Sequence, residues 1–195
     1  AQAIWPGASA AEAPPAPALL RGEMGWAQDA TTGLWWDGDD GPWWDNSGYW
    51  VKVPSTTEEI LASAHRVAVA ANTAGLITIS PEGFPRCRTV TTGHHVSGDL
   101  TEVSVATRSH TRKCGEVRAC PKVTVFWQEK SGSGAWVSVS GIASVEEGEG
   151  DKAKVKVAVQ HMEVVDYNAG VLGNGSDMWK PAVLERRDGA WAKLQ

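Results

Sequence analysis

Cations and hydroxyl groups gather between residues 86 and 113. Arg86 and Arg88 are separated by one residue in a strand-like run, so both side chains face the same side of it. The segment TRSHTRK (107–113) then places hydroxyls and three more cations where a strand gives way to a short helix. Guanidinium, ammonium and hydroxyl groups beside free backbone N–H groups at a helix N-terminus form an anion site. The pattern predicts a pocket for a phosphate monoester.

The overall charge makes this local cation cluster significant. The 195 residues carry a formal net charge of −5, which argues against non-specific nucleic-acid binding. No apolar run of about 18 residues is present, so no membrane span is predicted. The sequence starts at Ala1 and its first methionine is Met24. We therefore expect a soluble, intracellular protein. Import into a chloroplast or mitochondrion, with removal of a targeting segment, is one explanation for a sequence that does not start with methionine.

The cysteines and histidines indicate no metal site. The three cysteines lack CxxC spacing, which favours a reducing compartment over a disulfide framework or a zinc site. Cys87 lies between Arg86 and Arg88 and should point away from them as a buried, inert thiol. The pair His94-His95 has no third ligand nearby in the sequence, so a structural role is predicted for it.

The elements that position the cations form a small, mainly β domain over residues 54–195. A capping box at Ser55 and Glu58 predicts a helix with apolar residues at helical spacing, ending between Asn72 and Gly75. Alternating segments then predict antiparallel strands, with a short helix entered at Ser109 and a closing C-terminal hairpin. DKAKVKVAVQHMEVV (151–165) is predicted to be helical despite its alternation. These elements suggest a small barrel with short flanking helices.

Two different segments precede this domain. Residues 1–22 are rich in Ala and Pro and predict an extended arm. Residues 23–53 hold a repeat in which Asp29, Asp37 and Asp45 recur every eight residues, each after aromatic residues and before Gly. Asp and Gly are turn formers, so the repeat predicts a β-hairpin meander of short aromatic strands. DATTGLWWD (29–37) resembles the octamer repeat of the OCRE domain. We expect a partner-docking surface there, formed by Trp26, Trp35, Trp36, Trp43, Trp44 and Trp50.

Three motifs in order give the larger domain a family resemblance. GFPRCRTV (83–90), TRSHTRK (107–113) and PKVTVFW (121–127) follow one another within about 45 residues. Together they resemble pyridoxamine 5'-phosphate oxidase and the general stress protein class of FMN-binding split barrels, over roughly residues 56–191. The resemblance implies a split β-barrel and a homodimer that holds FMN at its subunit interface. A heme-degrading branch of the same fold uses histidine, which makes heme or metal binding the alternative role for His94-His95.

The resemblance also implies roles for particular residues. Arg88, Arg112 and Lys113 would hold the FMN phosphate, while Ala106 and Thr107 would line the ribityl chain and the ring edge. Thr89 and Val90 belong to the strand that would run beside the isoalloxazine. Trp136 stands where the oxidase has a glutamine that meets the flavin, and the strands from Trp136 onward could come from a second chain. The complete cofactor-binding set is Arg88, Thr89, Val90, Ala106, Thr107, Arg112, Lys113 and Trp136.

Departures from the oxidase pattern bear on the expected activity. Gly93 stands where the oxidase has a lysine that holds the vitamin phosphate, and the C-terminal ERRDGAW has no secure register on the oxidase substrate region. Vitamin B6 oxidation is therefore not expected. The first hypothesis is an FMN-dependent oxidoreductase acting on an unidentified small substrate. The alternative is a non-catalytic accessory subunit of a larger, organellar assembly, docked through its arm and Trp repeat, in which FMN binding has been lost.

Overall fold

The computed structural model divides the chain into two compact units, Ala1–Val53 and Pro54–Gln195. The structure describes residues 55–92, 96–129, 134–167, 169–173 and 180–194, together with the backbone of four short strands in the first unit. Among the described residues, no helix is long and apolar enough to cross a membrane.

The first unit contains a four-stranded antiparallel sheet. Strands β1 (Trp26–Gln28), β2 (Trp35–Asp37), β3 (Trp43–Trp44) and β4 (Trp50–Val51) pair in sequence order. This confirms the predicted meander of short strands, with β2 and β3 pairing Trp35 to Trp44 and Trp36 to Trp43. The tryptophan side chains and the extended arm lie outside the described residues. The docking role and the OCRE resemblance therefore stay predictions.

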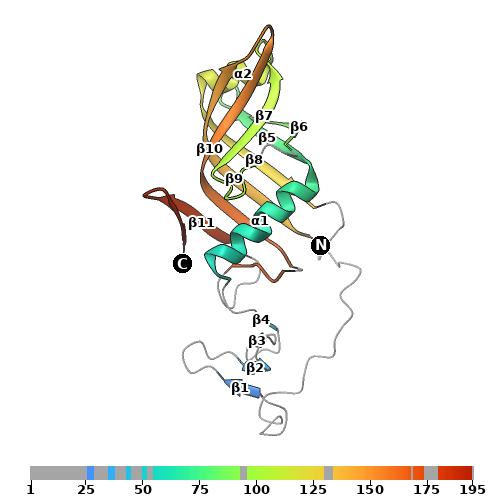
Figure 1. Ribbon diagram of the computed structural model, residues 1–195, viewed down its shortest axis with the longest axis vertical. Coiled ribbons are helices and arrows are strands. Elements are labelled where there is room, and N and C mark those ends of the chain that lie inside the picture. Colours follow the sequence, from blue (N-terminus) through green and yellow to red (C-terminus); the bar gives the residue numbers. More distant parts are fainter. Residues whose placement is uncertain are drawn as a thin grey trace. The chain divides into compact units, whose positions relative to one another are not determined.

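The second unit is a barrel of antiparallel strands with one open seam (Figure 1). The strands around the barrel run in the order β7–β10–β9–β8–β5–β6, and no ladder joins β6 to β7 among the described residues. This open seam makes the barrel a split one, as the sequence predicted. The barrel strands are β5 (Thr73–Ile79), β6 (Pro85–Thr91), β7 (Glu102–Arg108), β8 (Lys122–Gln128), β9 (Trp136–Glu147) and β10 (Lys152–Val165).

Helix α1 (Thr57–Ala71) begins at a capping box one residue later than predicted. Thr56 accepts a hydrogen bond from the backbone N–H of Glu59, and the Glu59 side chain accepts one from the backbone of Thr56. The helix ends at Asn72, which adopts a left-handed conformation with φ 57°, within the predicted range. Its buried face, which includes Ile60, Ala64 and Val67, joins the barrel core.

The segment predicted as a second long helix is strand β10, so that prediction was wrong. Ala153, Val155, Val157 and Val159 are buried at alternate positions, which is the period of a strand. The strand pairs with β9 along one edge and with β7, then β11 (Ala182–Arg187), along the other. Lys, Ala and Gln are good helix formers, but intrinsic helix propensity is a weak preference, and the strand pairing on both edges of this segment outweighs it.

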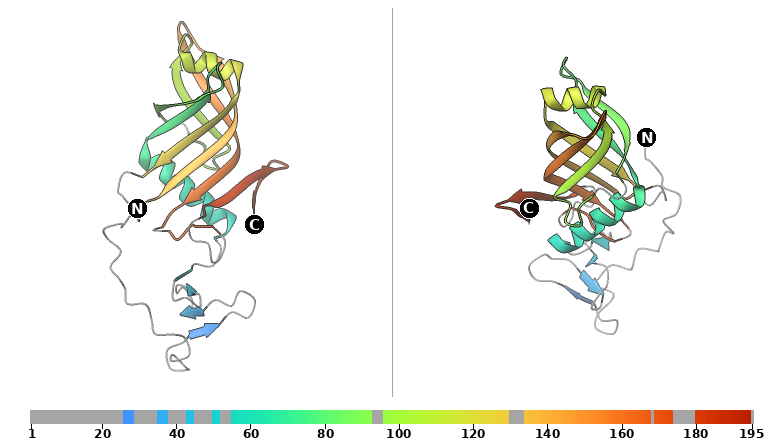
Figure 2. Two further views of the ribbon diagram at one scale, coloured as in Figure 1. Left: turned by 180° about the vertical axis from the view of Figure 1, so that it is seen from behind. Right: turned by 45° about the horizontal axis from the view of Figure 1, so that its top comes forward.

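The two ends of the barrel carry different elements. Helix α2 (Arg112–Ala119) lies at one end and α1 crosses toward the other, as Figure 2 shows from behind. The C-terminal hairpin, β11 with β12 (Ala190–Lys193), extends the sheet beyond the end of β10 that is farther from α2. Lys193 fastens it to the start of α1 by donating to the Ser55 carbonyl at 3.0 Å.

Candidate functional site

A buried carboxylate organises the cation cluster at the α2 end of the barrel. Glu116 of α2 is only 2% exposed, and its Oε2 accepts hydrogen bonds from Thr78 on β5 and from Arg88 Nη2 on β6, the latter at 2.7 Å. Arg88 Nη1 also donates to Thr78 Oγ1 at 2.6 Å. Strand alternation explains the meeting, because Thr78 and Arg88 both belong to the inward-facing sets of their strands.

The charge state of Glu116 follows from these contacts. Burial by itself raises the pKa of a carboxyl group, because the charged form is poorly solvated. Hydrogen bonds from Thr78 and Arg88, with the charges of Arg88 and Arg86, outweigh burial and hold the pKa of Glu116 below its ordinary value. Glu116 is therefore an anion near neutral pH and only accepts hydrogen bonds.

Lys113 lies at the start of α2, on the β7 side of the open seam. Its Nζ donates to Thr107 Oγ1 of β7 at 2.8 Å. The N-cap residue Thr111 makes no side-chain hydrogen bond to the helix backbone; its hydroxyl instead donates to the Arg108 carbonyl at 2.8 Å. The Arg112 side chain is 73% exposed and lies 3.7 Å from Glu116 Oε1.

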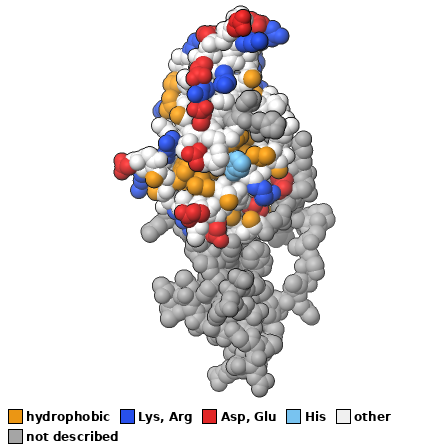
Figure 3. Space-filling view, in the orientation of Figure 1, with side chains coloured by type: hydrophobic (Ala, Val, Ile, Leu, Met, Phe, Trp, Pro, Cys, Tyr) orange, Lys and Arg blue, Asp and Glu red, His pale blue; other side chains and the backbone are white. Residues whose placement is uncertain are grey.

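A shallow hollow of about 430 Å³ opens beside these residues. It lies between the β5–β6 turn and the start of α2, and three guanidinium groups line it. Its lining includes Glu82, Arg86, His110, Arg112, Glu116 and Arg118. Acidic and basic side chains lie side by side on the face that Figure 3 shows. Ion pairs on the surface of this unit include Arg108 with Asp151 near α2, and Lys156 with Glu102 at 3.1 Å.

The structure brings part of the predicted cofactor set together. Arg88 and Arg112 lie beside Glu116, and Lys113 contacts Thr107 of β7. Val90 also faces inward, whereas Thr89 and Ala106 are exposed. Gly93 and the pair His94-His95 lie outside the described residues. Among the residues that are described, no group of three His, Cys, Asp or Glu could hold a metal ion.

Trp136 lies apart from this cluster within one chain. It begins β9 and pairs with Gln128, while Glu147 at the other end of the same strand forms an ion pair with Arg118 of α2. The length of β9 therefore separates Trp136 from the cations. Trp136 packs instead near Phe126 on the outer surface of the sheet, with ring centroids 6.0 Å apart.

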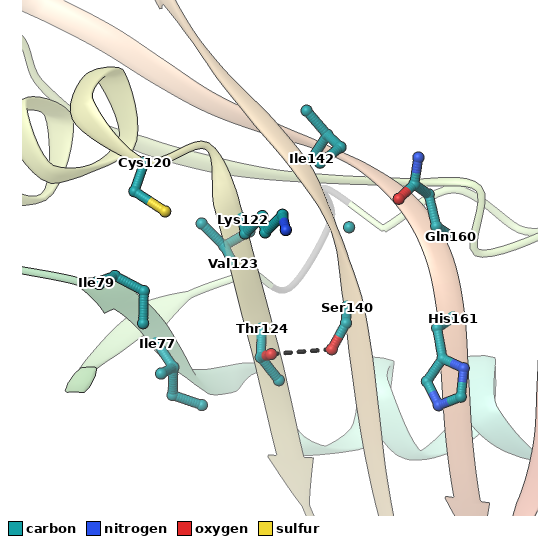
Figure 4. A pocket seen from close by; sticks show the side chains of 11 residues that line it. Ile77, Ile79, Cys120, Lys122, Val123, Thr124, Ser140, Ile142, Gln160 and His161 are labelled. Atoms are coloured by element: carbon teal, nitrogen blue, oxygen red, sulfur yellow. Dashed lines mark hydrogen bonds between the residues drawn. The ribbon is translucent and has the colours of Figure 1, made fainter. Parts of the chain in front are cut away.

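The outer surface of the sheet carries a second hollow, of about 420 Å³ (Figure 4). Ile77 and Ile79 of β5 line one side and Ile142 of β9 the other, with a 2.9 Å hydrogen bond between Thr124 and Ser140 across its floor. Cys87, predicted to be buried, is exposed on this outer side of β6. Its side chain does point away from Arg86 and Arg88, as predicted, but no described residue of this chain buries it on the outer side of β6.

Sequence reasoning missed Thr78 and Glu116. Glu116 follows Arg112 by four residues on the predicted helix, a spacing that places the two side chains on one face and could have indicated the pair. Thr78 carries no comparable signal, because only the pairing of β5 with β6 brings it to Arg88.

The comparisons define the class of fold. No family model matches the chain, and no curated protein matches it. Among solved structures, a protein from Clostridium acetobutylicum related to general stress protein 26 has a TM-score of 0.54 at 9% identity, covering 67% of this chain and 96% of that one. A pyridoxamine 5'-phosphate oxidase-related, FMN-binding protein from Nostoc punctiforme has a TM-score of 0.51 at 11% identity, covering 69% and 93%.

PhzG from Burkholderia lata, solved with tetrahydrophenazine-1-carboxylic acid, has a TM-score of 0.52 at 14% identity, covering 71% of this chain and 89% of that one. The chain therefore has the split-barrel fold of pyridoxamine 5'-phosphate oxidase-like proteins. This confirms the fold class that the three sequence motifs predicted.

The donor set at the seam fits the phosphate end of a flavin mononucleotide. Arg112 and Lys113 offer guanidinium and ammonium donors at the N-terminus of α2, and Thr107 and Thr111 add hydroxyls. Arg88 uses one donor on Thr78 and one on Glu116, which leaves three of its five N–H groups. The edge of β6 that faces the seam pairs with no described strand, so its backbone groups remain for polar ring atoms.

Proposed function

We propose that the chain binds FMN at the open seam and acts as a flavin-dependent oxidoreductase on a small substrate. The grouping of Arg88, Arg112 and Lys113 beside the unpaired edge of β6 carries this proposal. The bound flavin would supply the redox chemistry. The chain would supply the cations for the phosphate, with Glu116 and Thr78 holding the Arg88 guanidinium in place.

FMN and riboflavin titrations test this proposal. The two flavins share the ring system, but only FMN carries a phosphate. The variant Arg112→Gln/Lys113→Gln removes two exposed or half-exposed cations and leaves the buried Arg88–Glu116 pair intact. We expect its Kd for FMN to rise by at least about tenfold, because hydrogen bonds to charged groups contribute about 1.5–3 kcal/mol. The Kd for riboflavin should not change.

A matched control separates a local effect from a change in net charge. Arg186→Gln/Arg187→Gln removes two exposed cations from β11, away from the seam, and should bind FMN like the unchanged chain. The visible spectrum of the purified protein gives a second readout. A protein that shows no flavin bands and takes up no FMN would contradict the proposal.

We also propose that two copies of the chain pair through the outer surface of the sheet. Ile142 is 40% exposed there, and Ile77 and Ile79 are half-buried around the same hollow. Trp136 lies on that surface but far from the seam of its own chain. A second copy is the means by which Trp136 could reach a flavin.

A further inference from the structure

Glu116 leaves one carboxylate oxygen without a hydrogen bond in the hollow beside α2. Its Oε2 accepts hydrogen bonds from Thr78 and Arg88, but its Oε1 accepts none from any described residue. The nearest cationic atoms are Arg112 Nε at 3.7 Å and Arg86 Nε at 4.0 Å, both beyond hydrogen-bonding distance. A buried, charged acceptor without a donor is unfavourable. The arrangement therefore favours a ligand that brings a donor to Oε1.

The rest of the hollow favours an anion. Arg86, Arg112 and Arg118 line it, whereas Glu82 is the other carboxylate in the lining and pairs with Arg86 at 3.2 Å. An anion that contacts Arg86 and Arg112 also approaches Oε1, because both guanidinium groups lie beside that oxygen. Two acceptors in contact repel each other unless a hydrogen lies between them.

We propose that this hollow binds an oxyanion that carries a hydroxyl hydrogen: hydrogen phosphate or a singly protonated phosphate monoester. The hydroxyl donates to Glu116 Oε1, and the other oxygens accept from Arg86 and Arg112. The exposed Arg112 side chain is free to turn from the carboxylate toward the ligand. An oxyanion without a hydrogen, such as sulfate, presents only acceptors to Oε1 and is disfavoured. Glu116 thus determines the selectivity of the hollow.

The phosphate group has two possible sources, a flavin phosphate and free phosphate. The hollow shares Arg112 with the flavin site proposed above, but the selectivity at Glu116 does not rest on flavin binding. Inorganic phosphate and sulfate contain no flavin, so a failure to bind FMN leaves their relative affinities unaffected. The FMN and riboflavin titrations described above, run below about pH 6, where a phosphate monoester keeps one hydrogen, then tell whether the phosphate source is the cofactor.

Phosphate and sulfate at about pH 8 test the proposal on the full chain. The second ionisation of a phosphate group lies near pH 6 to 7, so at about pH 8 both anions carry two charges, but only hydrogen phosphate keeps a hydroxyl. In calorimetric titrations we expect the Kd for phosphate to be at least about tenfold lower than the Kd for sulfate, as one hydrogen bond to a charged acceptor allows. Equal values, tighter sulfate binding or no phosphate binding would overturn the proposal.

Two variants assign the selectivity to Glu116. Glu116→Gln supplies an amide that donates to either anion, so the ratio of the two Kd values should fall toward one. Glu82→Gln removes the same charge from the same hollow and should keep the native ratio. An unchanged ratio in Glu116→Gln would refute the role of Glu116.

If Glu116→Gln does not fold, the ratio of the phosphate and sulfate Kd values of the unchanged chain still tests the proposal. Arg112→Gln, at an exposed position, should then weaken both anions severalfold, and unchanged affinities would overturn the assignment to this hollow.

Discussion

At the scale of single residues, Asp166 shows how the barrel holds a buried charge. It has no exposed surface, and it accepts hydrogen bonds from Ser63, from Arg66 at 2.6 Å and from the backbone N–H of Ala169 at 3.1 Å. Burial raises the pKa of this carboxyl, but the hydrogen bonds and the charge of Arg66 outweigh it, so its pKa lies below the ordinary value. The ionised form therefore stabilises the folded chain.

Asp166→Asn should lower the free energy of unfolding by about 2 kcal/mol at neutral pH, the contribution of hydrogen bonds to a charged group. A carboxyl whose pKa is lower in the folded chain contributes fully above about pH 4, its range in the unfolded chain, and less as the pH falls through the folded pKa. Urea unfolding of both proteins should therefore give a smaller difference in acid. Glu163→Gln, at a half-buried position of β10, is the control. If Asp166→Asn lowered the free energy of unfolding equally at neutral pH and in acid, this account would be refuted.

At the scale of elements, the pairing of β9 with β10 depends on a glycine. A Cβ on Gly141 would lie 2.1 Å from the carbonyl oxygen of Ala158, where the register between the strands shifts from Val159 to His161. That backbone contact cannot be relieved by moving a side chain. Because β10 also pairs with β7 and β11 along its other edge, a displacement of the backbone at this irregularity would spread through the barrel.

Gly141→Ala should therefore destabilise the chain by about 2–4 kcal/mol, in the range of other severe backbone or packing defects. Gly115→Ala gives the matched control with the opposite sign. Gly115 lies inside α2 with open space around its would-be Cβ, and alanine there should stabilise by about 0.5–1 kcal/mol. Thermal unfolding of the two variants under the same conditions measures both effects. Similar shifts of the two midpoints would contradict the steric argument.

At the scale of the whole molecule, the proposed pairing of two chains predicts a charge-sensitive outer surface. Ile142→Lys places an ammonium group beside the apolar hollow, and burying it in an interface would be costly. Sedimentation velocity should therefore detect a dimer for the unchanged chain and a monomer for Ile142→Lys. Val69→Lys, on α1 and 44% exposed, changes a similar apolar side chain elsewhere and should remain dimeric. A monomeric unchanged chain would contradict the pairing.

Local patterns in the sequence were enough for much of this protein. Several features are short-range properties of the chain: the polar ends and apolar spacing of α1, the alternation of the barrel strands, and the turns of the aromatic repeat. The cations of the candidate site also follow from local spacing, since Arg88 shares the inward side of its strand with Arg86, and Arg112 and Lys113 begin a helix. The order of the motifs then indicated the split barrel.

Long-range pairing decided the rest. β10 is a strand because β9 occupies one edge and β7 and β11 share the other, neighbours that no local propensity reveals. The meeting of Thr78, Arg88 and Glu116 requires β5 to pair with β6 and α2 to lie against the end of the barrel. A buried carboxylate among arginines is stable only where several distant segments enclose it. The sequence alone therefore determined the cations of the site, and the tertiary structure determined the anion that arranges them.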